Sequence, residues 1–192
     1  LGNSALSGTA IKQITLPEGL TSVPYGLFIS CTALEQVNLP ESIESIGAYA
    51  FYDCKSLKSL YLPDGITGLG YYAFYNCSAL ESMDLSRSEL TTIQEDTFSQ
   101  CSKLSKVQLP ETLTRIEYEA FRSCSALTEI QLPDTLQTIE YSAFQYCSAL
   151  KSVELPDSVT SMGNYVFHGC SALESVKLPA GLTTIPYGIF YY

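Results

Sequence analysis

Seven cysteines and one histidine are the residues of this chain best suited to bind a metal ion or to act as nucleophiles. Successive cysteines lie 23 or 24 residues apart, so none forms the closely spaced pair typical of a zinc site. Only His168 could add a nitrogen ligand. The spacing therefore argues against zinc and leaves disulfide bonding or burial as the role of these residues: Cys31, Cys54, Cys77, Cys101, Cys124, Cys147 and Cys170.

Disulfide bonds are disfavoured by the same spacing. The count is odd, and each repeated segment contains one cysteine. If the segments stack, the Cβ atoms of this column point in parallel, whereas a disulfide needs two Cβ atoms that face each other. A buried cysteine behaves as a small apolar residue with a weak S–H donor. The sequence therefore predicts seven free, buried thiols.

Catalytic signatures are missing from the sequence. It contains no GxSxG, HExxH, phosphate-binding or dinucleotide-binding motif. His168 has no acid or nucleophile in a recognisable pattern beside it, and the Ser of CSAL recurs in successive segments, which indicates a structural role. We therefore expect no enzyme and no cofactor.

Charge and hydropathy exclude two further classes of partner. The 192 residues include 20 acidic and 10 basic side chains, which gives a net charge of −10. A nucleic acid or an anionic lipid surface requires a basic face, so both are disfavoured. No uninterrupted apolar run is long enough to span a bilayer, so we expect no membrane insertion.

A repeat of 23 residues governs the whole sequence. Every Phe keeps the interval of the cysteines, three residues before each cysteine position, and a Leu column is followed by Pro in every unit but one. The consensus is LxxVxLPxxLxxIxxxAFxxCxx. The Phe column contains Phe28, Phe51, Phe74, Phe98, Phe121, Phe144, Phe167 and Phe190.

The consensus predicts the elements of one repeat. Alternation such as Val37–Asn38–Leu39 indicates a short strand with one face inward. AFxxC is too short for an independent helix and predicts a single helical or 3-10 turn. One unit cannot bury its apolar side alone, so the units must stack into a solenoid. We expect eight parallel strands, centred on Ile14, Val37, Leu60, Met83, Val107, Ile130, Val153 and Val176.

The segment LPDGITGLGYYAFYNCSALESM, residues 62–83, closely resembles the BspA-like leucine-rich repeat of bacteria, and the resemblance extends over about residues 11–192. It implies an α/β leucine-rich repeat solenoid, right-handed and β-rich, with a parallel sheet on one face and short helical turns opposite. It also implies a secreted or cell-surface bacterial protein, in a family whose members are often adhesins for host or matrix proteins. The family brings no catalytic residues.

The predicted organisation is a single solenoid domain over residues 1–192. A partial unit 1–15 precedes the full units 16–38, 39–61, 62–84, 85–108, 109–131, 132–154 and 155–177, and a partial unit 178–192 follows. Because both ends lie within a unit, we expect a piece of a longer protein. Unit 85–108 has 24 residues, and we expect the additional residue, within Ser86–Glu89, to bulge outward.

Two outward surfaces are candidates for binding a protein partner. The first is the face of the predicted strands, near Tyr61, Asp84, Gln108 and Gln131. The second is a flank where tyrosines concentrate in two adjacent units, because Tyr is enriched at interfaces. It contains Tyr49, Tyr52, Tyr72 and Tyr75. A further column, Tyr25, Tyr71, Tyr118, Tyr141 and Tyr187, is expected only to cover the flank.

Two functions fit the repeats. One is a binding domain of a bacterial surface or secreted protein that engages a host or matrix protein. The other is a spacer that holds another domain away from the cell. A spacer needs only solvated outward positions, whereas a binder needs a local surface that differs from the average. The tyrosine cluster and the irregular unit favour binding.

Overall fold

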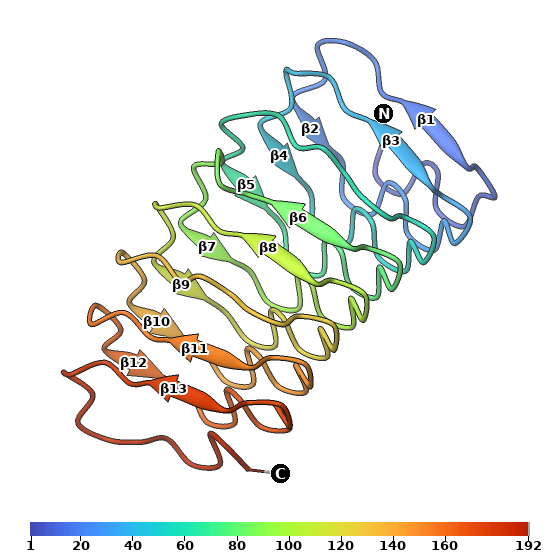
Figure 1. Ribbon diagram of the computed structural model, residues 1–192. Coiled ribbons are helices and arrows are strands. Elements are labelled where there is room, and N and C mark those ends of the chain that lie inside the picture. Colours follow the sequence, from blue (N-terminus) through green and yellow to red (C-terminus); the bar gives the residue numbers. More distant parts are fainter. Residues whose placement is uncertain (192) are drawn as a thin grey trace.

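The repeat folds into a stack of similar coils, each lying against the next along one axis (Figure 1). The computed structural model describes residues 1–191, so the final residue of the last partial unit, Tyr192, lies outside the described residues. Two rows of short strands run along the stack, and tight turns line the opposite side (Figure 1). Within residues 1–191 there is no helix long and apolar enough to cross a membrane.

The first row of strands, which we call the strand face, follows the prediction at six of eight positions. It contains β1 (Gln13–Thr15), β3 (Gln36–Asn38), β6 (Ser82–Asp84), β8 (Lys106–Gln108), β11 (Ser152–Glu154) and β13 (Ser175–Lys177). They form three separate parallel pairs, β1–β3, β6–β8 and β11–β13. The prediction is wrong at Leu60 and Ile130. Both side chains are buried, but their segments form no strand, and only an isolated Glu129–Ser152 bridge remains.

A second row of strands was not predicted. Its seven members have two residues each: β2 (Ser22–Val23), β4 (Ser45–Ile46), β5 (Gly68–Leu69), β7 (Thr92–Ile93), β9 (Arg115–Ile116), β10 (Thr138–Ile139) and β12 (Ser161–Met162). They form one sheet in the order β2-β4-β5 and another in the order β7-β9-β10-β12. Two residues are too few to show an alternating pattern, so the sequence revealed only an inward apolar position here.

The predicted helical turns are wrong, because residues 1–191 contain no helix. Two residues in each turn, such as Tyr49 (φ 56°) and Asp53 (φ 59°), adopt the left-handed conformation, which interrupts a right-handed helix. The backbone N–H groups then alternate between two kinds of acceptor. Tyr52 N–H donates within the turn to the Tyr49 carbonyl (3.1 Å), whereas Phe51 N–H donates to Ala73 of the next coil (2.8 Å).

The core is a continuous column of apolar side chains through all coils. The phenylalanine rings stack along the axis, with neighbouring centroids 5.1 to 6.1 Å apart. Seven of the eight rings are fully buried, and Phe190 in the last coil is half-buried. The predicted burial of this column is therefore confirmed for the first seven members.

All seven cysteines are free and buried beside the phenylalanine column. Each thiol of the later six donates to the carbonyl of a Phe one coil earlier, as Cys77 does to Phe51 (3.1 Å) and Cys124 to Phe98 (3.2 Å). Burial raises the pKa of Cys101 and Cys170 to about 12. The thiols therefore link adjacent coils and stay protonated at neutral pH.

The irregular unit accommodates its additional residue as predicted. Leu85 and Leu90 remain buried, while Ser86, Arg87 and Glu89 between them are exposed. The same unit also buries three polar side chains that the consensus does not contain, those of Asp96, Thr97 and Ser99.

Asp96 is an unusual carboxylate for this position. Its side chain is only 4% exposed, and its backbone has a φ of 51°. Burial raises the pKa of this carboxyl above its usual value, and the charges of Glu119 and Glu95 act in the same direction. The folded state therefore binds a proton at Asp96 more tightly than the unfolded chain does.

We predict that Phe121→Ala lowers the free energy of unfolding by about 3–5 kcal/mol, because it leaves a cavity in the ring stack. Urea denaturation measures the loss. The control is Tyr61→Ala, because this side chain is 65% exposed and no aromatic ring contacts it within residues 1–191, so its effect should stay within about 0.5 kcal/mol. Equal losses in the two variants would contradict a role of the phenylalanine column in stability.

We predict that the native thiols react slowly with a thiol-specific reagent and rapidly once the chain is unfolded in urea. Burial blocks access and suppresses the reactive thiolate. Counting labelled sites by intact mass against time tests this. Fast labelling of most cysteines in the native state would show that the column is open to solvent.

We predict that Asp96→Asn raises the thermal midpoint at neutral pH. Because the folded pKa is raised, the stability of the native protein falls as pH rises from the ordinary Asp value through the folded value. Asn is neutral throughout and tolerates a left-handed backbone. The advantage of the variant should therefore shrink below the ordinary Asp pKa. Melting curves against pH test this, with the exposed Asp134→Asn as control, and a pH-independent difference would refute it.

Candidate functional site

The four residues predicted on the strand face lie at equivalent positions of four successive coils. Asp84 and Gln108 end β6 and β8 and are paired in register. Tyr61 and Gln131 lie in the two segments that form no strand, and all four residues are exposed, with Tyr61 at 65%. The structure therefore brings these residues into one row along the stack.

The four residues of this row line two separate grooves. The first groove, of about 470 Å³, contains Tyr61 and Asp84 and lies between residues 59–64 and 82–88. The second groove, of about 880 Å³, contains Gln108 and Gln131 and extends across residues 106–111, 129–134, Ser152 and Glu154. Each groove adjoins a segment that has left the strand ladder, and the β6–β8 pair separates the two. The β6–β8 pair is consequently a ridge between two hollows, and the strand face is not flat.

The first groove has fixed charges. Asp84 accepts hydrogen bonds from the Ser86 N–H (2.9 Å) and the Ser86 hydroxyl (2.7 Å). These bonds lower the pKa of Asp84, so the carboxylate is ionised at neutral pH. At the rim, Arg87 forms an exposed ion pair with Asp64 (3.2 Å). Tyr61 adds an apolar ring beside these charges.

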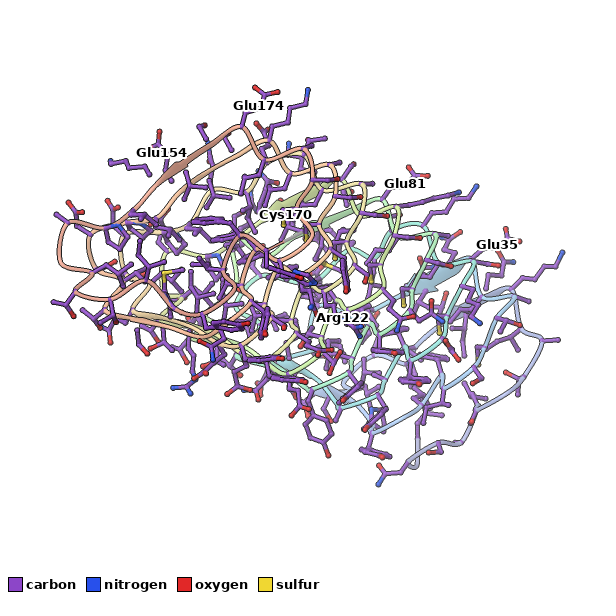
Figure 2. All side chains as sticks on the ribbon, turned by 90° about the horizontal axis from the view of Figure 1, so that it is seen from below. Glu35, Glu81, Arg122, Glu154, Cys170 and Glu174 are labelled. Carbon is purple, nitrogen blue, oxygen red and sulfur yellow. The ribbon has the colours of Figure 1, made fainter. Side chains whose placement is uncertain are left out.

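The second groove is acidic. Four of its lining residues are carboxylates, against one lysine, Lys106. Within residues 1–191 none of these carboxylates forms an ion pair. Glu154 points outward from the stack, as Glu35, Glu81 and Glu174 do, whereas Cys170 lies inside it (Figure 2). A positively charged surface would complement this groove. The four carboxylates are Glu111, Glu129, Asp134 and Glu154.

The tyrosines predicted on the flank form one cluster. Tyr49 stacks on Tyr72 with centroids 5.0 Å apart, and Tyr52 stacks on Tyr75 at 4.9 Å. The Tyr72 hydroxyl donates to Glu95 (3.3 Å). All four rings are half-buried, and stacking covers part of each ring face. The cluster therefore contributes to packing between coils, and a partner could reach only part of each ring.

The outer tyrosine column behaves in two ways. Tyr118 and Tyr141 stack on each other at 5.4 Å, which fits the expected covering of the flank. Tyr71 instead meets Tyr49 edge-on, at 87°, and lines a third hollow beside β5. Sequence reasoning missed this hollow, because it depends on the second row of strands.

His168 lies in an aromatic group near the end of the described chain. Its ring is half-buried, and Nδ1 lies 2.6 Å from the Tyr191 carbonyl oxygen while Nε2 lies 3.3 Å from the Tyr146 hydroxyl. No carboxylate contacts it among the residues that the structure describes. The same residues contain no cluster of three or more His, Cys, Asp or Glu side chains suited to a metal ion.

Solved structures with this architecture come from several bacteria. A leucine-rich repeat protein of Bacteroides ovatus matches with a TM-score of 0.74 and 29% identity, over 90% of this chain and 50% of that one. A leucine rich cell surface protein of Faecalibacterium prausnitzii gives 0.65 and 23%, over 99% and 67%. The pneumococcal vaccine antigen PcpA gives 0.57 and 25%, over 94% and 54%. The chain thus spans half the length of the Bacteroides ovatus protein.

Sequence comparison points to the same group of proteins. No curated protein sequence matches the chain. The family model described as "BspA type Leucine rich repeat region" matches in six copies, over residues 1–124 and 91–192. These ranges together cover the whole chain, and they confirm the resemblance found in residues 62–83. The chain therefore belongs to the BspA-type leucine-rich repeat family.

Proposed function

We propose that this chain is a non-enzymatic protein-binding domain of a bacterial cell-surface or secreted protein, and that it engages a host or extracellular-matrix protein through the strand face. The observation that supports this most directly is the pair of grooves that contain Tyr61, Asp84, Gln108 and Gln131. A domain that served only as a spacer would need no hollows on its outward face.

The family supports the non-enzymatic part of this proposal, because leucine-rich repeats are generally scaffolds for binding. The location is supported by the similarity to PcpA, which is named a vaccine antigen, since such an antigen must be accessible to antibodies. The strand face contributes the specificity. An aromatic side chain beside an ionised carboxylate in the first groove offers both a contact area and a fixed charge.

The spacer function and the tyrosine flank remain the alternatives. The flank has more aromatic rings, but stacking already covers part of their faces. Tyr61, by contrast, is the most exposed aromatic residue on the strand face and has no ring stacked on it within residues 1–191. This difference in availability favours the strand face.

We predict that Tyr61→Ala combined with Gln108→Ala weakens binding to a partner by about 2 kcal/mol or more, the usual effect of truncating an aromatic anchor. The thermal midpoint should stay nearly unchanged, because both side chains are exposed. Immobilised fibronectin, laminin and collagen are the probes, measured by surface plasmon resonance against the unmodified domain.

The matched control combines Tyr52→Ala with Tyr75→Ala. It should leave binding nearly unchanged while it lowers the thermal midpoint, since it removes a stacked pair. If binding is weaker only in this control, the partner binds to the tyrosine flank and not to the strand face. If none of the probes binds and a wider screen of matrix proteins is negative, the spacer function becomes the better explanation.

A further inference from the structure

A third hollow lies on the second row of strands, away from the grooves of the strand face. It has a volume of about 430 Å³ and lies where β5 and β7 face each other. These two strands are neighbours along the stack, yet they belong to different sheets and are not paired. We call this place the ladder gap.

The ladder gap contains backbone groups without partners. Elsewhere in this row, the N–H that follows each strand donates to the preceding coil, as Gly70 does to Ile46 and Glu117 to Ile93, both at 2.9 Å. The equivalent bond from Gln94 N–H to the Leu69 carbonyl is not formed, and neither group has another partner within residues 1–191.

A second pair of backbone groups in the ladder gap is also unpartnered. Thr114 N–H donates to the Thr91 carbonyl (2.9 Å), but Thr91 N–H makes no such bond to the Thr67 carbonyl. The additional residue of the irregular unit explains why the Thr91–Thr67 and Gln94–Leu69 bonds are both absent. It shifts the register, so that Glu89 N–H donates to the Ile66 carbonyl (2.8 Å) where Thr91 N–H would donate to the Thr67 carbonyl in a regular unit. Two donors and two acceptors therefore remain for water or a ligand.

The ladder gap is closed at both ends. Glu89 N–H bonds to the Ile66 carbonyl on one side, and Tyr72 N–H bonds to the Glu95 carbonyl (2.9 Å) on the other. An inserted peptide strand would need about 4.8 Å of additional separation along its whole length. The two closing bonds forbid that separation, so the space suits a compact ligand and not an extended chain.

The lining of the ladder gap is neutral and has one aromatic wall. Gly68 and Gly70 leave its floor without side chains, and a Cβ on Gly70 would collide with the backbone of Ala48. Tyr71 stands beside this floor with 44% of its surface exposed. Its ring is oriented by edge-on contacts with Tyr49 (5.4 Å) and Tyr72 (6.2 Å).

The remaining polar groups of the lining are hydroxyls and one amide. They belong to Thr67, Thr91, Thr92 and Gln94, and no charged side chain takes part. A pocket of this size with an apolar wall and a few converging polar groups is the usual form of a small-molecule site. The lack of a basic residue disfavours a phosphate or a carboxylate, and the lack of an acidic one disfavours a cation.

We propose that the ladder gap binds one ring of a neutral sugar, so that the domain also recognises glycans. The C–H face of a pyranose packs against the Tyr71 ring. Its hydroxyl groups donate to the Leu69 and Thr67 carbonyls and accept from the Gln94 and Thr91 N–H groups. An apolar ligand of the same size would leave these four backbone groups unpaired, which makes it a poor occupant.

The test uses the unmodified domain and separate titrations with glucose, galactose, mannose, fucose, N-acetylglucosamine and N-acetylgalactosamine, followed by saturation-transfer NMR. We expect saturable binding of at least one of them. Tyr71→Ala should weaken it by about tenfold or more, the scale on which aromatic contacts act. Tyr118→Ala is the matched control, because it lies at the same repeat position with 41% exposure and lines no part of the gap.

Each outcome decides between occupants. A loss in Tyr71→Ala with less than a twofold change in Tyr118→Ala supports the proposal, provided that both variants keep the native melting profile. No saturable binding of any of the six sugars overturns it, and so does an equal loss in the two variants. Loss of a protein ligand but not of a sugar in Tyr71→Ala would make the gap part of a protein interface. The strand-face variant Tyr61→Ala with Gln108→Ala should leave sugar binding unchanged, so this proposal can fail independently of the strand-face function.

Discussion

Hydrogen bonds that run from the backbone of one coil to the next are the interaction on which this structure depends. In the turns, every second N–H donates to the following coil, as Phe51 does to Ala73 and Phe98 to Ala120 (2.8 Å each). These bonds hold neighbouring coils at one spacing. The Phe rings can then stack, and each later Cys thiol can reach a Phe carbonyl of the coil before it. The register of the backbone therefore positions the column of Phe and Cys side chains, and the packing of this column in turn stabilises the register.

The places where this register fails coincide with the hollows of the surface. The segments around Leu60 and Ile130 leave the strand ladder, and a groove adjoins each of them. The additional residue before Leu90 separates β5 from β7, and the ladder gap lies between them. In a repeat protein each coil contacts only its neighbours, so such a defect stays local and the core on either side is preserved. Irregularity therefore creates concave sites at little cost to the rest of the stack.

The features that could be predicted from the sequence are those that follow from the periodicity of the side chains. The inward columns, the outward bulge near Arg87 and six of the eight strands follow from the repeated letters alone. The missing strands at Leu60 and Ile130 could not be foreseen, because their units have the same spacing of inward apolar residues as the units that do pair. Whether two coils pair depends on the separation of their backbones, which the spacing of the inward residues does not distinguish here. The helical turns failed for a related reason, since residues such as Tyr49 and Asp53 are not ones whose type requires a left-handed backbone.

The candidate sites likewise have features that the sequence predicts and features that depend on backbone pairing. The exposed row from Tyr61 to Gln131 was predictable, because alternation places these residues outward, but its two grooves arise from lost pairing. The sequence predicts that Tyr71 only covers the flank, as its equivalent Tyr118 does, and the two differ in what lies beside them. Tyr118 neighbours a complete ladder at β9, whereas Tyr71 neighbours two glycines and four unpaired backbone groups. In a repeat fold, equal residues at equal positions therefore acquire different roles from the backbone around them, and a departure from the 23-residue period is the signal in the sequence that indicates where to look.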